Sequence, residues 1–395
     1  MEPSDLRIAL FSGNYNYVRD GANQALNRLV DYLLRQGAHV RVYSPVRDNP
    51  AFPPTGDLVN VPSIAIPNRP EYRIPCSLSA RVRADLEEFA PNIVHVSSPD
   101  PVAHRAVTWA RAKGIPVVAS VHTRFETYLQ YYGLDWFEPG MRALLRRFYR
   151  RCDAIVAPAD STAAVLYAQR MSRDISIWSR GVDRDQFNPK RRSMEWRAKH
   201  GIADDEMVVV FLGRIVMEKG LEVFVEAINA AVKRKVKHRV LVIGEGPARG
   251  WFEASLPNNA IFVGEQTGDD LAVALASADV FLNPSITEAF GNVTQEAMAC
   301  ALPVVAASAT GATNLVRDGV TGILVDPLEP DQYGEALARY AVDPKLRRAH
   351  GTAGLDFAKT RDWDTINADV MKLYTRVIER RARMDALYGK RWLPS

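Results

Sequence analysis

Apolar and polar positions follow two alternating patterns along most of the chain. Short runs rich in Val, Ile and Phe, such as 7–13 (RIALFSG) and 207–213 (MVVVFLG), predict buried parallel strands. Longer stretches with apolar residues every three or four positions separate these runs. One of them, 22–36, predicts a helix that stops at Gly37. Strands that alternate with helices predict βαβ units around parallel sheets covered on both faces.

This alternation occurs twice, so the sequence predicts an α/β protein with two doubly wound, Rossmann-like domains. The predicted strands of the first half are 7–13, 39–45, 93–99, 116–122 and 154–160, with helices at 22–36, 78–89, 102–112 and 136–151. Those of the second half are 207–213, 239–244, 260–264, 279–285 and 303–308. We expect an N-terminal domain over 1–185 and a C-terminal domain over 186–362. A long helix over 363–395 is expected to pack back on the first domain.

Composition narrows the class of protein. The chain has 395 residues, of which 47% are hydrophobic and 24% charged, and these fractions exclude a largely disordered chain. No uninterrupted apolar stretch is long enough to predict a membrane-spanning helix. Three cysteines, Cys76, Cys152 and Cys300, make a poor disulfide framework, so we expect a reducing, cytoplasmic setting.

The positive charge is confined to the first half of the chain. The net charge is +4, and the residues up to Phe187 contain 23 Lys and Arg against 19 Asp and Glu. The remainder is therefore neutral. This excess is too small to predict a nucleic-acid-binding protein, but it suits an anionic surface or substrate.

Two cations follow the predicted strand 207–213. Arg214 lies directly after it, and Lys219 precedes Gly220 at the expected start of a helix. Arg and Lys beside a helix N-terminus form an anion site, because the free N–H groups and the helix dipole also favour negative charge. Solvated surface charges would give the same pattern.

An acidic segment follows the predicted strand 279–285. Glu288 and Glu296 flank 290–293, whose backbone N–H groups would open a helix and suit a phosphate. Eight helical residues span about 12 Å at most, so the two carboxylates would hold opposite ends of an elongated ligand. A sugar joined through a diphosphate to a ribose has this shape. An acidic helix start with one exposed Glu is the alternative.

Together with the turn Gly244-Glu-Gly-Pro247, these segments resemble the GT-B glycosyltransferases of family 4. The resemblance covers nearly the whole chain. It implies that Arg214 and Lys219 neutralise the donor diphosphate, that Glu288 holds the hydroxyls of the donor sugar, and that Glu296 holds the ribose. The donor site it implies comprises Gly21, Gly213, Arg214, Lys219, Gly244, Glu288, Phe290, Gly291, Asn292, Val293 and Glu296.

The resemblance also gives the first half of the chain a role. It implies that the loop 14–23 approaches the donor phosphates and the acceptor, with Gly21 allowing close approach of the backbone. His122 ends a predicted strand and could donate a hydrogen bond to a sugar hydroxyl; a structural histidine is the alternative. Family members carry a His in the cleft after the corresponding strand. The expected catalytic residues are therefore His122, Arg214, Lys219 and Glu288.

Two further segments resemble a branch of the family that acts on lipids. These are Ser120-Val-His-Thr123 and 178–183 (WSRGVD), in which Arg180 stands where many relatives carry Asn. The branch includes lipid mannosyltransferases and sulfoquinovosyl-diacylglycerol synthases. The resemblance implies a retaining transfer of a hexosyl unit to a lipid, with GDP-mannose favoured as donor. UDP-sugar-dependent glycolipid synthesis (glucosyl, glucuronosyl or sulfoquinovosyl), polysaccharide synthesis and sugar-nucleotide epimerisation remain alternatives.

Basic and aromatic segments raise the question of membrane contact. The helix 136–151 carries five arginines after an aromatic stretch that runs from Phe125 to Phe137, and the tail 376–391 is also basic and precedes Trp392. A basic amphipathic helix can lie on anionic lipid, which would place the protein peripherally on the inner face of the cell membrane. A helix packed on the core with a solvated basic face predicts the same pattern.

Neither a tightly bound cofactor nor an essential metal is expected. The nucleotide-sugar donor would be a substrate, and Arg214 and Lys219 already supply the compensating charge. Two Asp-x-Asp pairs, Asp183–Asp185 and Asp362–Asp364, lie at the expected domain boundary and before the last helix, where the second pair suits a helix cap. The expected partners are therefore a nucleotide sugar, a lipid acceptor and an anionic membrane surface, without nucleic acid.

Overall fold

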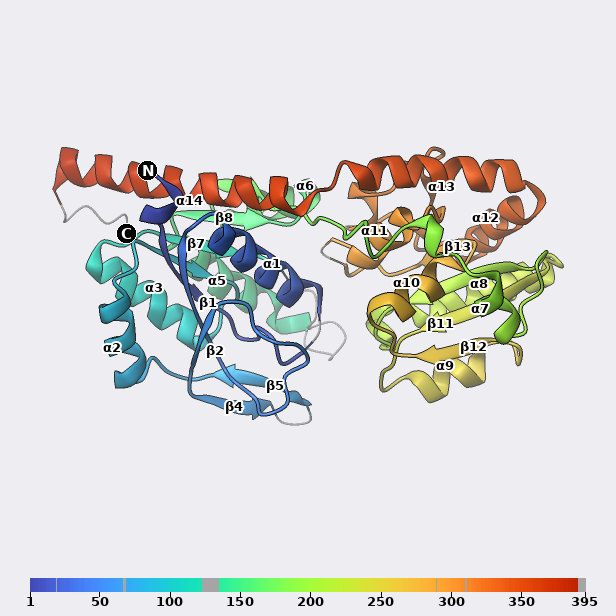
Figure 1. The fold of residues 1–395 in the computed structure, drawn as a ribbon, viewed down its shortest axis with the longest axis horizontal. Helices are drawn as coiled ribbons and strands as arrows, with labels where there is room; N and C mark the ends of the chain where they lie inside the picture. The colour runs from blue at the N-terminus through green and yellow to red at the C-terminus, as the bar shows by residue number, and fades with distance from the viewer. Residues whose placement is uncertain (19, 67–68, 123–134, 289, 310, 390–395) are drawn as a thin grey trace. The chain divides into compact units, whose positions relative to one another are not determined.

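The computed structural model describes residues 1–18, 20–66, 69–122, 135–288, 290–309 and 311–389. The chain divides into two compact units (Figure 1). Unit 1 comprises Met1–Arg180 and Trp363–Ser395, and unit 2 comprises Gly181–Asp362. The division after Arg180 falls five residues before the predicted boundary after residue 185.

Unit 1 is built on a seven-stranded sheet in the order β3-β2-β1-β6-β7-β8-β9. All of its neighbouring strands are parallel. The strands are β1 (Arg7–Phe11), β2 (His39–Ser44), β3 (Asp57–Asn60), β6 (Ile93–Val96), β7 (Val117–Ser120), β8 (Ala154–Ala157) and β9 (Ile175–Ile177). The five predicted strands of this half are all present and are shorter at their carboxyl ends, where polar loops begin.

Helices cover both faces of this sheet. They are α1 (Gly21–Arg35), α2 (Ala80–Phe89), α3 (Pro101–Lys113), α5 (Glu138–Tyr149), α6 (Asp160–Ala168) and α14 (Trp363–Tyr388). Alternate residues of β1 enter two cores: Ala9 and Phe11 pack with α2, α3, α5 and α6, whereas Ile8 and Leu10 pack with α1 and α14. The last helix therefore supplies part of the core of unit 1, beside α1 (Figure 1).

Charged side chains fix α14 in place as well. Asp364 in its first turn pairs with Arg35 of α1 at 2.7 Å. Further along the helix, Arg376 and Arg380 both pair with Asp174, which precedes β9. Three arginines of the basic tail, Arg376, Arg380 and Arg381, thus form ion pairs within unit 1.

A small antiparallel sheet, formed by β4 (Ser63–Ile66) and β5 (Arg69–Pro75), was not predicted from the sequence. The short strands β3 and β9 were not predicted either. Strands β3, β4 and β9 are only three or four residues long and are half-exposed or exposed, so they lack the continuous apolar run that marks the buried strands.

Unit 2 has a six-stranded parallel sheet in the order β12-β11-β10-β13-β14-β15. Its strands are β10 (Met207–Leu212), β11 (His238–Ile243), β12 (Ile261–Gly264), β13 (Val280–Asn283), β14 (Val304–Ala307) and β15 (Gly322–Val325). Five of these six correspond to predicted strands. The edge strand β15 was not predicted, because its residues 322–325 (GILV) are short and begin with Gly.

The helices of unit 2 are α7 (Met194–Lys199), α8 (Leu221–Lys233), α9 (Arg249–Ser255), α10 (Gly268–Ala276), α11 (Asn292–Ala299), α12 (Pro330–Val342) and α13 (Pro344–Lys359). Helices α8, α9 and α12 pack on one face of the sheet, where Val209 and Phe211 of β10 enter the core. Val208 and Val210 point to the other face and are also buried, so both faces are covered. Helix α11 packs on α13.

Each sheet has a point at which the order of its strands reverses. In unit 1 this point lies between β1 and β6, and in unit 2 it lies between β10 and β13. The loops after two such strands lead to opposite faces of the sheet, which leaves a crevice at the carboxyl edge where open α/β sheets bind ligands. Both predicted constellations of unit 2 follow the two strands at its reversal point.

The cysteines and the lengths of the helices bear on two expectations from the sequence. Cys76, Cys152 and Cys300 are free thiols, and the last two are buried. Across the described part of the chain, no helix has the length and apolar character needed to cross a membrane.

Candidate functional site

The reversal point of unit 2 brings two helix N-termini to the same sheet edge. Helix α8 follows β10 and α11 follows β13, and their N-cap residues are Gly220 and Gly291. Both glycines have a positive φ, of 74° and 98°, and neither helix has a side-chain cap. Uncapped first-turn N–H groups retain their hydrogen-bonding capacity, so both helix starts can donate to an anion.

Lys219 and Glu288 link these two helix starts. Lys219 ends the 3-10 turn Met217–Lys219 before α8, and its Nζ lies 3.0 Å from Glu288 Oε1. The Glu288 side chain is 8% exposed, whereas that of Lys219 is 34% exposed. The cation therefore reaches solvent while the carboxylate stays enclosed. This pair confirms that the two segments, 69 residues apart, meet at one place.

Polar neighbours hold the Glu288 carboxylate from its other side. Asn283, the last residue of β13, places Nδ2 3.3 Å from Glu288 Oε2 and 3.1 Å from Thr294 Oγ1 of α11. The Thr287 hydroxyl donates to the carbonyl of Glu218 over 2.9 Å, which ties the loop after β13 to the turn before α8. Neither Asn283 nor Thr294 was predicted as a site residue from the sequence. A polar Asn283 at the end of the apolar strand β13 is the signal that could have identified it.

Glycines allow the backbone to come close at this edge. A Cβ on Gly291 would lie 2.9 Å from Glu288 Oε2, and one on Gly220 would lie 3.0 Å from the Pro284 carbonyl oxygen. Gly213 and Gly244 have φ values of 147° and 145°, and a Cβ on Gly244 would clash with the Gly213 carbonyl. These positions therefore require glycine. Gly213 and Gly244, predicted as part of the donor site, let the loops after β10 and β11 come together.

The other predicted residues of unit 2 lie on the same two segments. Arg214 is exposed directly after β10 and Gly213. Phe290 is 6% exposed and packs inward, while Asn292 and Val293 are half-buried in the first turn of α11. Glu296 lies one turn further along α11, half-buried. Burial, and then the Glu296 charge, raise the pKa of the Cys300 thiol to about 12.

His122 lies in unit 1, two residues after β7, and both of its ring nitrogens have partners. Nε2 is 2.8 Å from Ser120 Oγ, and Nδ1 is 2.9 Å from Nη2 of Arg180. The ring also meets the indole of Trp178 edge-on, with centroids 5.5 Å apart. Burial, then the charges of Arg180 and His95, lower the pKa of His122 well below its usual range. His122 is therefore neutral at physiological pH.

The loop before α1 is tightly packed rather than open. Tyr15 and Tyr17 are buried, and their hydroxyls donate to the carbonyls of Thr55 and Gly13. Gly21 is the first residue of α1, and the Asp20 side chain accepts from the Asn23 N–H over 2.8 Å. A side chain thus already caps this helix, unlike α8 and α11, which leaves less of its N-terminus for an anion.

The predicted membrane-contacting segments are only partly described. Of the aromatic stretch, Phe125, Tyr128, Tyr131 and Tyr132 lie outside the described residues, as does Trp392. Trp136 and Phe137 precede α5 and are 76% and 43% exposed. Within α5, Leu145, Phe148 and Tyr149 are buried, so one face of this helix belongs to the core of unit 1.

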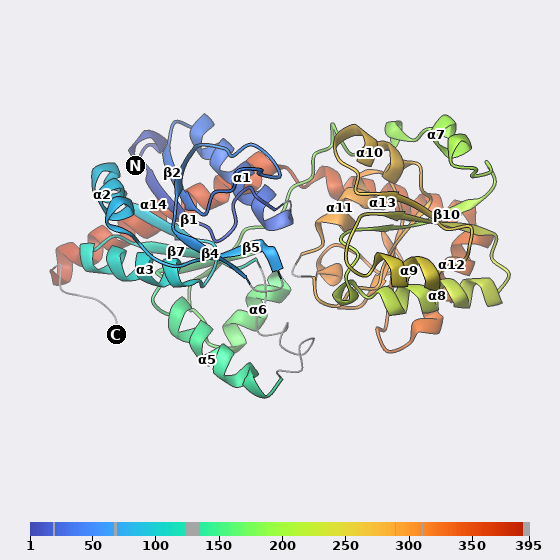
Figure 2. The same ribbon diagram turned by 90° about the horizontal axis from the view of Figure 1, so that it is seen from below.

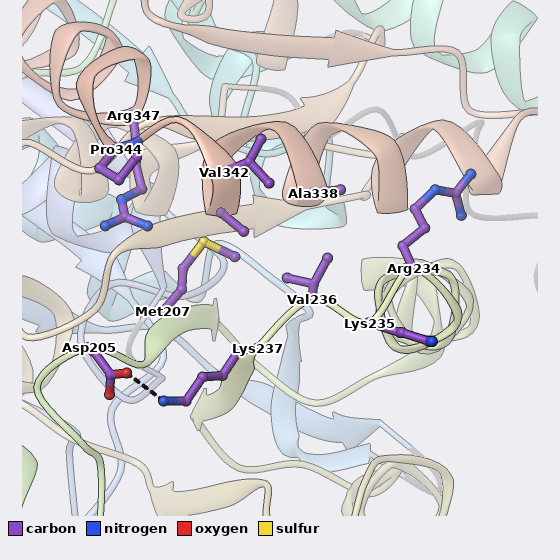
Figure 3. A pocket seen from close by; sticks show the side chains of 11 residues that line it. Asp205, Met207, Arg234, Lys235, Val236, Lys237, Ala338, Val342, Pro344 and Arg347 are labelled. Carbon is purple, nitrogen blue, oxygen red and sulfur yellow. Dashed lines mark hydrogen bonds and ion pairs between the residues drawn. The ribbon is translucent and has the colours of Figure 1, made fainter.

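Two other features do not belong to the candidate site. A pocket of about 320 Å³ lies between Met207, Val236 and Val342, beside the ion pair of Asp205 and Lys237 (Figure 3). It adjoins the amino ends of β10 and β11, whereas the candidate site follows their carboxyl ends. Within the ranges that the structure describes, no group of three His, Cys, Asp or Glu side chains is arranged to hold a metal.

Comparison with known proteins identifies the family. Residues 19–186 match the family described as Glycosyltransferase Family 4, and residues 206–343 match the one described as Glycosyl transferases group 1. A sulfoquinovosyl transferase of Arabidopsis thaliana is 30% identical, over 90% of this chain and 71% of its own length. A GDP-mannose-dependent alpha-mannosyltransferase of Mycolicibacterium smegmatis is also 30% identical, over 95% of this chain and 99% of its own.

Solved structures agree on the fold. A sucrose-phosphate synthase from Thermosynechococcus elongatus superposes with a TM-score of 0.78 at 21% identity, covering 95% of this chain and 100% of that one. The Anabaena protein HepE, solved in complex with UDP, superposes with a TM-score of 0.73 at 18% identity, over 94% and 100%. Both predictions, of the fold and of the enzyme class, are thus confirmed. The chain belongs to the family 4 glycosyltransferases and has their GT-B fold of two Rossmann-like domains.

Proposed function

We propose that this glycosyltransferase moves a mannosyl unit from GDP-mannose to a lipid acceptor, with unit 2 binding the donor and unit 1 the acceptor. The observation that carries the proposal is the Lys219–Glu288 pair between two uncapped helix starts. A cation and free N–H groups suit a diphosphate, and an adjacent enclosed carboxylate suits sugar hydroxyls. Donor binding would then separate the pair, with Lys219 turning to phosphate and Glu288 to the sugar.

The relatives point to two candidate donors. Three GDP-mannose-dependent alpha-mannosyltransferases match 94–96% of this chain at 26–30% identity. The plant sulfoquinovosyl transferase is equally similar, and the structural neighbour HepE binds UDP. A UDP-sugar-dependent glycolipid synthase is therefore the second candidate. The donor base distinguishes the two.

The chemistry proposed for the site is stabilisation of the leaving group. When the sugar–phosphate bond breaks, negative charge grows on the departing nucleoside diphosphate. Lys219, Arg214 and the first N–H groups of α8 and α11 would meet that charge with donors already in place. Gly220 and Gly291 let the two helix starts lie close to Pro284 and Glu288, since a Cβ at either position would approach these residues too closely.

Nucleotide binding tests the donor. We expect GDP, but neither UDP nor ADP, to raise the melting temperature of the protein, because a site selective for GDP-mannose would bind the guanine base as well as the diphosphate. The measurement is a thermal shift at matched nucleotide concentrations, followed by the intact sugar nucleotides. A shift with UDP alone would replace the mannosyl proposal with the UDP-sugar alternative. Absence of any shift would contradict the donor site itself.

Replacing Lys219 tests its part in turnover. A charge-assisted hydrogen bond contributes about 1.5–3 kcal/mol, so Lys219→Ala is expected to lower kcat roughly 10- to 100-fold. The assay is release of GDP from GDP-mannose in the presence of a lipid extract. Lys233→Ala, an exposed change at the other end of α8, is the matched control and should leave the rate unchanged. An unchanged rate in Lys219→Ala would remove this residue from the mechanism.

The stereochemical course is a separate element of the proposal. Membership of family 4 favours retention of the anomeric configuration, and we propose that the acceptor attacks on the face that the leaving group departs from. The anomeric proton coupling of the first-formed product, measured by NMR, should match that of the α-configured donor. An inverted product would overturn the same-face mechanism while leaving the donor assignment intact.

Helix α5 is the part of unit 1 that we propose to contact an anionic membrane. It lies at the margin of the unit (Figure 2), and Leu144, which is 49% exposed, shares its outer side with the exposed Arg147 and Arg150. Positive charges are close together here: burial, and then the neighbouring charges of Arg111 and Arg147, lower the pKa of Arg151. An anionic lipid surface would relieve this repulsion and take up the apolar side chains.

Vesicle binding tests this surface. The protein should pellet with phosphatidylglycerol-containing vesicles at low salt and less at high salt, since screening weakens the attraction. The double variant Trp136→Ala/Arg147→Glu should lose most of this binding. The matched change in unit 2, Trp251→Ala/Arg184→Glu, also replaces an exposed Trp and an exposed Arg and should bind as the wild type does. Wild-type protein that stays in the supernatant at low salt would contradict the membrane proposal.

A further inference from the structure

Five polar side chains form a continuous hydrogen-bonded chain through unit 1. Arg180 contacts Nδ1 of His122 at 2.9 Å, and His122 Nε2 lies 2.8 Å from Ser120 Oγ. Ser120 Oγ is also 2.8 Å from Nε2 of His95 in β6, whose Nδ1 lies 2.5 Å from the Tyr374 hydroxyl in α14. Arg180, Ser120, His95 and Tyr374 are each no more than 3% exposed, and only His122 is half-buried.

The cation at one end fixes the direction of the first two bonds in this chain. A guanidinium can only donate, so Nδ1 of His122 accepts and carries no proton. The single proton of the neutral ring is then on Nε2, which donates to Ser120 Oγ. Ser120 Oγ, which accepts from His122, can either donate to His95 Nε2 or accept from it, so the directions of the two bonds beyond Ser120 follow the tautomer of His95.

The positions of these groups are fixed by packing. Nη1 of Arg180 donates to the carbonyls of Trp178 and Ser179, and its guanidinium lies 4.6 Å from the centre of the Trp178 ring. The indole N–H of Trp178 donates to Asn367 of α14 over 3.1 Å. These contacts hold the Arg180 guanidinium beside the Trp178 indole and next to His122.

The charges around His122 agree with these roles. Burial lowers the pKa of Arg180 to about 9, which leaves it cationic at neutral pH, and lowers that of His95 to about 3. Within the described part of the chain, the charged and titratable groups that act on His122 are Arg180, from the loop after β9, and His95, from β6. Tyr374 on α14 stays neutral, because burial raises its pKa.

We propose that Arg180 is a positioning residue that commits His122 to the neutral Nε2–H tautomer, so that His122 can only donate a hydrogen bond through Nε2 and cannot act as a general base. Its role toward substrate rests on the proposed function. A sugar oxygen at this position would share or replace Ser120 Oγ as the acceptor. Arg180 and Ser120 act through His122 and are not themselves catalytic.

The test is the protonation state of His122 in the ligand-free full-length protein. Long-range proton–nitrogen NMR of histidine-labelled protein should show the Nε2–H pattern at every pH between about 5 and 8. The chain has seven histidines, and loss of one signal in His122→Gln makes the assignment. A wild-type ring that carries its proton on Nδ1, or that titrates near pH 6.5, would overturn the proposal.

Substitution of Arg180 then tests the cause. Arg180→Met should release the tautomer, with proton on either nitrogen or titration within the same pH range, whereas Arg180→Lys should keep the Nε2–H form. Arg173→Met, an exposed change before β9, is the matched control and should behave as the wild type does. An Arg180→Met protein whose His122 spectrum equals that of the wild type would refute the role of Arg180.

A second variant keeps the proposal falsifiable if Arg180→Met does not fold. Ser120→Ala removes the partner of Nε2 but retains Arg180, so the Nε2–H tautomer should persist; a switch to Nδ1–H would show that Ser120 sets it and would overturn the proposal. In the active enzyme, the kcat profile of Arg180→Lys should follow the wild type across this pH range. Correct NMR results without GDP-mannose activity would refute the proposed function alone.

Discussion

In a parallel sheet that helices cover on both faces, polar side chains reach solvent at the ends of the strands. This constraint determines where the polar residues of both units lie. Buried strands such as β10 consist almost entirely of apolar residues, so their ends are the first positions at which a charged side chain reaches solvent. At the reversal point of unit 2, the strands β10 and β13 lead to helices on different sides. Their two N-termini are therefore left at one edge, with Lys219 and Glu288 in contact between them.

The sequence contains enough information to predict this framework, because its strands and helices obey simple periodicities. The buried strands and the long helix α14 could be predicted to within a few residues. Lys219 and Glu288 could also be placed, since both follow strands that a parallel sheet must bring to one edge. Short, half-exposed strands such as β4 and β15 carry too few apolar positions to be distinguished from loops.

The supporting polar contacts could not be predicted in the same way. His95 and Tyr374 are 279 residues apart, and nothing in the local pattern of either residue names the other. A histidine inside the apolar strand 93–96 (IVHV) does signal a buried polar group that needs partners, but a partner's identity depends on tertiary packing. Similarly, the sequence shows Arg180 beside Trp178, yet only the fold shows that both rest against His122 and that Asn367 holds the indole.

The division of the chain also bears on how the protein is made. Unit 2 is continuous from Gly181 to Asp362, whereas unit 1 needs Val370, Leu373, Tyr374 and Val377 from the end of the chain to complete one of its two cores. Domains generally fold from the N-terminus as they leave the ribosome. Here that order is reversed for the finished state: the second unit has all of its residues first, and the core that α1 shares with α14 in the first unit is incomplete until α14 has been synthesised. During translation, the apolar residues that α14 covers in the finished protein therefore lack this cover until the last helix emerges.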